Sequence, residues 1–126
     1  MAVPDFNSVA WFEFGTDQPE KVQEFYGELF DWTYLRNTNT PGVTYHSVMP
    51  PGAQRPAGGV WESEGGFPNY AIFYVLVRDV AATVERAGEL GAEVLMEPVS
   101  DTAGFSFARL RDTADNHFGV FSAPAP

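Results

Sequence analysis

A unit that occurs twice is the feature of this sequence that most limits its possible folds. The segment Gly27 to Phe30 (GELF) has a counterpart 61 positions later, Gly88 to Gly91 (GELG), and each segment ends a helical pattern that follows an apolar strand. A repeat of this period indicates duplicated supersecondary units. We expect the two units to pair around a cleft that both halves line, so the side chains of that cleft should decide the function.

Length and composition exclude several classes of protein. The 126 residues, 44% of them hydrophobic, suffice for one compact domain and are too few for two independent ones. The sequence has no apolar run of about eighteen residues and no signal-like leader, so we expect a cytoplasmic protein without membrane contact. Because cysteine is absent, disulfides, thiolate nucleophiles and sulfur-ligated zinc are excluded. A net charge of −10 argues against a nucleic-acid partner.

The first unit is predicted to span about residues 7–62, as a strand, a helix and three more strands. Asp17 fits a helix N-cap, Glu20 completes a capping box, and the helix ends near Phe30. The apolar helix face is predicted to carry Val22, Phe25 or Tyr26, and Leu29. Apolar and β-branched runs predict the strands at 9–14, 32–35, 43–49 and 57–61.

The second unit, about residues 69–122, repeats this order after a linker at about 62–68. Asp79 is the predicted N-cap of its helix and Gly91 the C-cap. The helix face is predicted to carry Val80, Val84, Ala87 and Leu90. The strands are predicted at 70–77, 93–96, 105–111 and 117–121, followed by a frayed tail at 122–126.

The resulting fold class is α+β. Residues 1–126 form one domain in which two βαβββ modules make a curved mixed sheet with a barrel-like cleft and with the helices outside. Gly27 and Gly88 both lie inside predicted helices, where glycine costs about 1 kcal/mol relative to alanine. Both glycines therefore predict a close approach of helix to sheet.

These residues resemble the vicinal oxygen chelate superfamily, which includes glyoxalase, extradiol dioxygenases and antibiotic-sequestering bleomycin-resistance proteins. The resemblance rests on the helix with its Phe25 and Tyr26 pair and on the ending with Asp112, Asn116, Phe118 and Gly119, and it covers nearly the whole chain. It implies the paired-module fold and no single activity. It also implies that modules pair within one chain or between chains, and we expect a homodimer.

The metal-dependent members of this family hold their metal with ligands on the first and last strands of each unit. The resemblance places Trp11 and Ile72 at the two first-strand positions, and Gly59 and Gly119 at the two last-strand positions. None of these side chains donates an oxygen or imidazole nitrogen to a cation. We therefore expect no metal and no other cofactor.

Two histidines leave an alternative open. His46, in the third predicted strand, and His117, at the start of the last one, could join Glu13 in an unconventional metal site. A histidine at a strand edge that only makes hydrogen bonds is the commoner case.

Period-two alternation predicts which side chains enter the cleft. Trp11 and Glu13 share one face of the first strand, and Ile72 and Tyr74 share the matching face of the fifth. Phe107 and Arg109, with Phe105, share a face of the seventh strand, which is either the cleft side or the helix side. The predicted ligand-binding residues are Trp11, Glu13, Tyr45, Trp61, Ile72, Tyr74, Phe107 and Arg109. An aromatic share of 15% suits a flat aromatic ligand.

The function favoured by the sequence is metal-free binding of a small aromatic molecule, of the bleomycin-resistance type, with sequestration of a natural product or antibiotic. The alternative is a lyase, isomerase or dioxygenase of the glyoxalase type, working without metal through Glu13 or with a noncanonical metal site. In that case Glu13, Tyr74 and His117 are the catalytic candidates. A role as a scaffold for a partner has no specific signal in the sequence.

Overall fold

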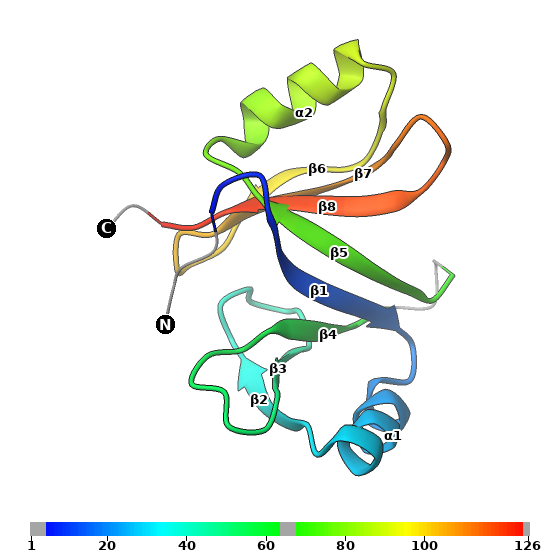
Figure 1. Cartoon of the computed structure of the whole chain (residues 1–126), viewed down its shortest axis with the longest axis vertical. Coiled ribbons are helices and arrows are strands. Elements are labelled where there is room, and N and C mark those ends of the chain that lie inside the picture. Colours follow the sequence, from blue (N-terminus) through cyan, green and yellow to red (C-terminus); the bar gives the residue numbers. More distant parts are fainter. Residues whose placement is uncertain (1–4, 64–67, 125–126) are drawn as a thin grey trace. The chain divides into compact units, whose positions relative to one another are not determined.

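The computed structural model describes residues 5–63 and 68–124 (Figure 1). Each half of the chain has the order strand, helix and three strands, so the predicted α+β class with two βαβββ modules is confirmed. The predicted linker residues 64–67 and the predicted tail residues 125–126 lie outside the described residues. The elements are β1 (Val9–Thr16), α1 (Pro19–Phe30), β2 (Thr33–Asn37), β3 (Tyr45–Met49), β4 (Gly58–Glu62), β5 (Tyr70–Leu76), α2 (Val80–Glu89), β6 (Glu93–Ser100), β7 (Ser106–Arg111) and β8 (His117–Ser122).

The chain divides into two compact units with the same strand arrangement. The N-terminal unit is Trp11–Ala71, and the C-terminal unit is Met1–Ala10 together with Ile72–Pro126. The strand order is β2-β3-β4-β1 in the N-terminal unit and β5-β8-β7-β6 in the C-terminal unit. In each unit the first and last strands of the module pair in parallel, while the remaining pairs are antiparallel. The duplication seen in the sequence therefore extends to strand direction.

The core of the N-terminal unit is built from aromatic rings. Phe14 of β1 packs against Tyr26 of α1, with ring centroids 4.9 Å apart, and Phe12 packs against Trp32 at 5.5 Å. Tyr26 and Trp32 stack at 5.4 Å with an interplanar angle of 14°. Stacked and edge-on rings of this kind add to the free energy gained from buried area.

The position of Tyr26 decides which face of α1 meets the sheet. Val22 and Tyr26, one turn apart, are both half-buried, and Tyr26 packs against Phe14 of the sheet, so Tyr26 and not Phe25 is the inward member of the pair. Phe25 is 61% exposed and Leu29 is 58% exposed. The prediction that Leu29 lies on the buried face is therefore wrong, because Tyr26 fills the space between helix and sheet and Leu29 is turned outward.

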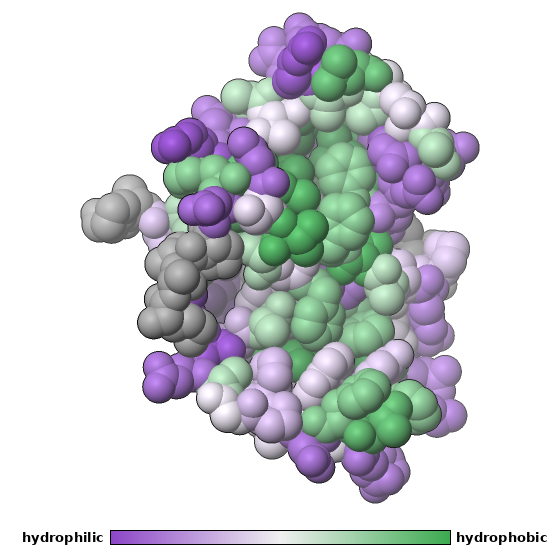
Figure 2. Space-filling view, viewed as in Figure 1, coloured by the Kyte–Doolittle hydropathy of each residue, from purple (hydrophilic) through white to green (hydrophobic). Residues whose placement is uncertain are grey.

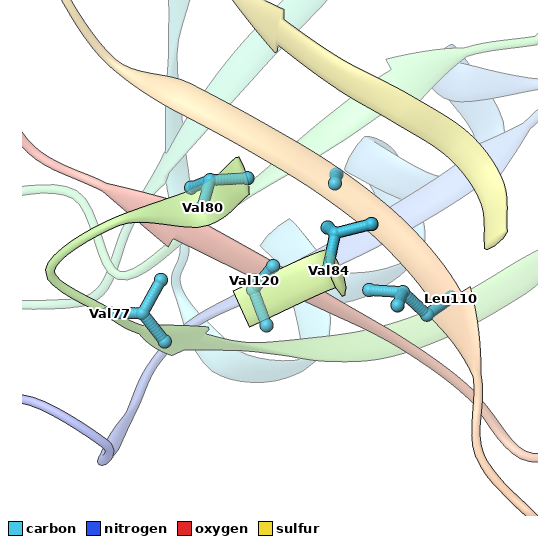
Figure 3. Packing of buried hydrophobic residues seen from close by; sticks show 6 residues of the cluster. Val77, Val80, Val84, Leu110 and Val120 are labelled. Carbon is cyan, nitrogen blue, oxygen red and sulfur yellow. The ribbon is translucent and has the colours of Figure 1, made fainter. Parts of the chain in front are cut away.

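The core of the C-terminal unit is aliphatic, and Figure 3 shows it. Val80 and Val84 of α2 are 3% and 8% exposed, which confirms their predicted place on the helix face. Leu90, predicted on the same face, is 60% exposed because the helix has already ended at Glu89. The residues that complete this core are Val77, which directly follows β5, Ala108 and Leu110 of β7, and Val120 of β8.

The two helices begin differently. Asp79 caps α2, since its Oδ1 accepts from the Ala82 N–H at 3.0 Å, as predicted. The N-cap of α1 is Gln18 and its side chain makes no capping bond, so the prediction of Asp17 as N-cap is wrong. Thr16 Oγ1 accepts from the Gln18 N–H at 3.0 Å, and this turn delays the helix to Pro19. Neither helix of the described chain has the length and apolarity needed to cross a membrane.

The two helical glycines have different surroundings. A Cβ at Gly27 would lie 3.2 Å from the Trp32 carbonyl oxygen, in the connection from α1 to β2, and 3.6 Å from the ring of Tyr34 in β2, so the tight contact at this position is to the connection and not to the sheet. A Cβ at Gly88 would meet nothing within 4 Å, so the predicted close approach of helix to sheet is wrong for Gly88. The C-cap of α2 is Leu90, so the prediction of Gly91 as the C-cap is wrong by one residue. Gly91, with φ of 103°, directly follows Leu90 in the conformation that glycine adopts readily.

Candidate functional site

One face of the sheet in the N-terminal unit packs against α1, and the opposite face carries the candidate site. Phe12 and Phe14 of β1 contact the aromatic core beneath α1, so the alternate residues of β1 point the other way. The strand register places the corresponding residues of β3 and β4 on this second face. We call it the Glu13 face, and it carries Trp11, Glu13, Tyr45, Trp61 and Tyr70.

The carboxylate of Glu13 is fixed by tyrosine hydroxyl groups. Tyr45 Oη donates to Glu13 Oε1 at 2.9 Å, and Tyr70 Oη donates to Glu13 Oε2 at 2.6 Å. Trp11 Nε1 in turn donates to Tyr45 Oη at 3.0 Å. Glu13 is only 8% exposed, and a carboxylate removed from water needs such donors. The bonds hold the carboxylate in one orientation among aromatic rings.

Glycines beneath the rings make this arrangement possible. A Cβ at Gly59 would collide with the ring and hydroxyl of Tyr45, and a Cβ at Gly15 would collide with the ring of Tyr70. Both tyrosine rings therefore lie directly against the strand backbone. Trp61 extends this aromatic surface, since its ring lies 6.4 Å from the Tyr70 ring at an interplanar angle of 31°.

In the C-terminal unit, the face opposite α2 carries the remaining predicted ligand-binding residues. Ala108 and Leu110 of β7 belong to the core beneath α2, so the alternate residues Phe107 and Arg109 point to the opposite face. This answers the question that the sequence left open for this strand. Ile72 and Tyr74 of β5 are 8% and 4% exposed.

Tyr74 covers a glycine just as Tyr45 does. Tyr74 pairs with Gly119 in the register of β5 with β8, and a Cβ at Gly119 would collide with the Tyr74 ring. Glu13 pairs with Gly59 in the equivalent register of β1 with β4. The duplication therefore maps Glu13 onto Tyr74, at the 61-position offset found in the sequence, and Gly59 onto Gly119, at an offset one position shorter.

Two cations shape the electrostatics of the C-terminal unit. Arg109 is 9% exposed, and its Nη2 lies 3.9 Å from Met96 Sδ. Burial, followed by the charges of Arg109 and Arg111, lowers the pKa of His117 to about 4. The imidazole of His117 is therefore neutral at pH 7, because burial disfavours its charged form and protonation would add a positive charge beside Arg109 and Arg111.

The four positions that the family uses for metal ligands do not fit a metal in this chain. Trp11 offers an N–H donor that is engaged with Tyr45, and Ile72 offers only hydrocarbon. At Gly59 and at Gly119, a tyrosine ring fills the space that a ligating side chain would need. Divalent cations require oxygen or imidazole donors, which this set lacks.

The alternative histidine site also lacks the necessary geometry. His46 pairs with Val60 on the α1 side of the sheet, whereas Glu13 lies on the other face of the same sheet. His117 belongs to the C-terminal unit. Within residues 5–63 and 68–124, no three His, Cys, Asp or Glu side chains are grouped so that they could hold a metal ion.

The sequence prediction missed Tyr70, whose hydrogen bond to Glu13 is shorter than that of Tyr45. Two signals were present: Tyr70 shares the period-two pattern of Ile72 and Tyr74, and Gly15 interrupts an apolar strand where another group approaches closely. Of the predicted residues, Trp11, Glu13 and Tyr45 are joined by hydrogen bonds.

A shallow groove of about 450 Å³ lies elsewhere, between the N-terminal segment and α2 in the C-terminal unit. It contains none of the predicted site residues. Its lining consists of Asn7, Val77, Arg78, Asp79, Ala82, Thr83, Arg86, Ala87 and Leu90.

Residues 8–120 match a model of the Glyoxalase/Bleomycin resistance protein/Dioxygenase superfamily. The chain belongs to this superfamily. The paired βαβββ modules agree with that membership, and the resemblance inferred from the helix and the closing strand is confirmed.

Two curated relatives are the provisionally named glyoxylase CFP32 of Mycobacterium bovis and the protein of the same name from Mycobacterium tuberculosis. Each is 29% identical to this chain over 124 residues, which are 98% of this chain and 47% of the relative. The chain thus spans about half the length of the curated relatives that it matches.

Solved structures with a similar fold have low sequence identity. A methylmalonyl-CoA epimerase superimposes with a TM-score of 0.65 at 14% identity, over 98% of this chain and 100% of that one. The methylmalonyl-CoA epimerase of Mycobacterium tuberculosis gives 0.62 at 14% identity, over 100% and 93%. Hypothetical protein BH1468 of Bacillus halodurans gives 0.67 at 14% identity, over 94% and 96%. At this identity the likeness concerns the fold alone.

Proposed function

We propose that this protein binds a flat aromatic small molecule without a metal ion, and that it sequesters a natural product or antibiotic without altering it. The binding surface is the Glu13 face. Its aromatic side chains are the stacking groups, and the Glu13 carboxylate orients the ligand. The family membership supports the proposal, because the superfamily includes bleomycin-resistance proteins.

One observation carries the proposal: two tyrosine hydroxyls hold a carboxylate within an aromatic surface, and the family's four metal positions hold no oxygen or imidazole nitrogen that could ligate a metal. Well-placed ring pairs each contribute about 0.5–1.5 kcal/mol beyond area burial. Two tyrosine rings lie flat on glycines and are joined to Trp11 and Glu13 by hydrogen bonds, so this surface is preorganised. A preorganised surface loses little side-chain entropy when a ligand binds.

A second candidate function is an isomerase or lyase in which Glu13 transfers a proton. The names of the relatives favour it: solved structures of the same fold are methylmalonyl-CoA epimerases, and one of them contains methylmalonyl-CoA. In this reading Glu13 is the proton acceptor or donor, and Tyr74 and His117 are the further candidates. The homodimer and the cytoplasmic location stay predictions.

Tryptophan fluorescence tests the leading proposal. Trp11 and Trp61 lie on the Glu13 face, whereas Trp32 lies in the core beneath α1. Titration with polycyclic aromatic antibiotics should quench the wild type and the Trp32→Phe variant alike. Quenching should be lost when Trp11 and Trp61 are both changed to phenylalanine.

Two further measurements separate the candidates. If the protein only binds, mass spectrometry finds the ligand unchanged, and EDTA leaves the affinity as it was. A new product whose formation stops in Glu13→Gln supports the isomerase or lyase. Quenching by no compound of the panel, or affinity abolished by EDTA, contradicts metal-free sequestration.

A further inference from the structure

The C-terminal half of α1 exposes an unusual concentration of apolar side chains. Phe25, Leu29 and Phe30 are 61%, 58% and 48% exposed. Phe25 and Leu29 are one helical turn apart and therefore adjacent on the helix surface. Nine large hydrophobic side chains are exposed in the part of the chain that the structure describes. Positions 25–30 hold three of these nine side chains. Figure 2 shows the apolar patch over α1, at the lower right.

Acidic side chains border this patch. Glu24, Glu28 and Asp31 are all exposed, and the last turn of α1 contains no basic residue. The backbone carbonyl groups at a helix C-terminus already carry partial negative charge, which favours cations and disfavours carboxylates. Among the described residues, the recorded ion pairs are Arg86–Glu89 and Arg111–Glu93, and neither involves α1.

The duplicate helix α2 shows that the fold does not require this arrangement. Leu90, the counterpart of Leu29, is the single large apolar residue exposed there. Arg86 lies in the last turn of α2 and pairs with Glu89 at 3.2 Å. The acidic and apolar surface is thus particular to α1.

We propose that the segment Glu24–Asp31 of α1 docks a basic amphipathic segment of a partner protein. Phe25, Leu29 and Phe30 supply the apolar contact, and lysine or arginine side chains of the partner pair with the acidic border. A second copy of this chain is the less favourable occupant, because the chain carries a net charge of −10 and two acidic surfaces repel each other. This surface is independent of the ligand bound on the Glu13 face.

Synthetic peptides test the proposal with the full chain. One fluorescent amphipathic peptide carries leucines at i, i+3, i+4 and i+7 spacing with lysines on its other face, and a second has glutamates in place of the lysines. Fluorescence anisotropy should detect binding of the lysine peptide only. The affinity should fall between about 0.1 M and about 1 M salt, because salt screens exposed charges.

The duplication supplies matched control variants. Leu29→Ser and Glu24→Lys should each weaken binding about tenfold, a typical loss when an interface anchor is removed. Leu90→Ser and Glu85→Lys, the equivalent changes on α2, should leave the affinity within about twofold. Circular dichroism checks that each variant is folded. If Leu29→Ser unfolds the protein, Glu24→Lys still tests the proposal, because Glu24 is exposed.

Three outcomes would overturn the proposal. The first is equal binding of both peptides, since charge would then not select the partner. The second is equal weakening by the α1 and α2 variants. The third is concentration-dependent dimerisation of the wild type that Leu29→Ser abolishes, because a second copy would then occupy the surface.

Discussion

Tyr70 and Glu13, 57 positions apart in the sequence, are joined by a hydrogen bond of 2.6 Å from the phenol to the carboxylate. Gly15 allows this contact, because a side chain there would displace the Tyr70 ring. The contact ties the first residue of β5 to the middle of β1 within the N-terminal unit. The Glu13 face therefore depends on Gly15 and Tyr70, and neither residue is at one of the four positions that hold metal ligands in the metal-dependent members of the family.

Removing this hydrogen bond should destabilise the fold. We expect Tyr70→Phe to lower the free energy of unfolding by about 1.5–3 kcal/mol, the range for a hydrogen bond to a charged group. Urea denaturation measures the change. Tyr34→Phe is the control, since Tyr34 Oη is buried and makes no hydrogen bond within the described residues. Equal destabilisation by both variants would show that the hydroxyl of Tyr70 has no special role.

A side chain at Gly59 should disrupt the same face by another route. In Gly59→Ala the new Cβ collides with the Tyr45 ring, so Tyr45 must turn away and lose its bonds to Trp11 and Glu13. We expect a loss of about 1–3 kcal/mol, as for overpacking. Tyr45→Ala should remove the collision, so the double variant should lose less than the sum of the two single losses. Strict additivity in a double-mutant cycle would contradict the contact.

The two helical glycines should respond in opposite ways to alanine. Gly88→Ala should stabilise the protein by about 0.5–1 kcal/mol, because alanine is the better helix former and the site is open. Gly27→Ala has the same advantage in helix propensity, but its new Cβ lies 3.2 Å from the Trp32 carbonyl oxygen. We therefore expect the free energy of unfolding of this variant to stay the same or to fall. Thermal unfolding of both variants measures the difference. A gain from Gly27→Ala as large as that from Gly88→Ala would exclude the close contact.

The sequence predicted the fold well because its signals are local and occur twice. Alternation, apolar runs and turn residues located all eight strands to within a few residues. Errors arose where tertiary packing chose between equivalent local patterns. Nothing in the spacing of α1 shows that Tyr26, and not Phe25, fills the space against Phe14. Likewise, nothing in the local sequence shows that the N-cap of that helix is Gln18 and not Asp17.

The candidate site was predictable in part for the same reason. Alternation placed Trp11 and Glu13 on one face, and the offset between the units located Tyr74 opposite Gly119. The link from Tyr70 to Glu13 is a contact between strands distant in sequence, and no local pattern specifies such a contact. Gly15 marked a close approach without identifying the approaching group.

The contrast between the two helix starts leads to a further prediction. Asp79→Ala should destabilise the protein by about 1 kcal/mol, the usual cost of removing a side-chain N-cap. Asp17→Ala should change the free energy of unfolding by less than about 0.5 kcal/mol, because this exposed side chain caps no helix. Urea denaturation of the two variants measures both values. A large effect at Asp17 would indicate that Asp17 is the N-cap and that α1 begins one residue earlier, at Gln18.

His117 should make stability depend on pH below neutrality. Its pKa is about 4 in the folded protein and 6.5 in the unfolded chain. Between these values the unfolded chain binds the proton and the folded protein does not, so stability falls as the pH is lowered from 6.5 to 4. The pKa of Asp112 is lowered from 3.8, chiefly by the backbone N–H groups of Asn116 and Ala114, so its stabilising contribution is lost only at more acidic pH.

Urea midpoints at pH 7 and pH 5 should therefore differ more for the wild type than for His117→Gln, which has no imidazole to titrate. Carboxylates titrate in both proteins, so the difference between them isolates His117. An NMR titration of the His117 ring protons should give a midpoint near pH 4. A midpoint near 6.5, or equal pH dependence of the two proteins, would show that neither burial nor the charges of Arg109 and Arg111 lower the pKa of this imidazole.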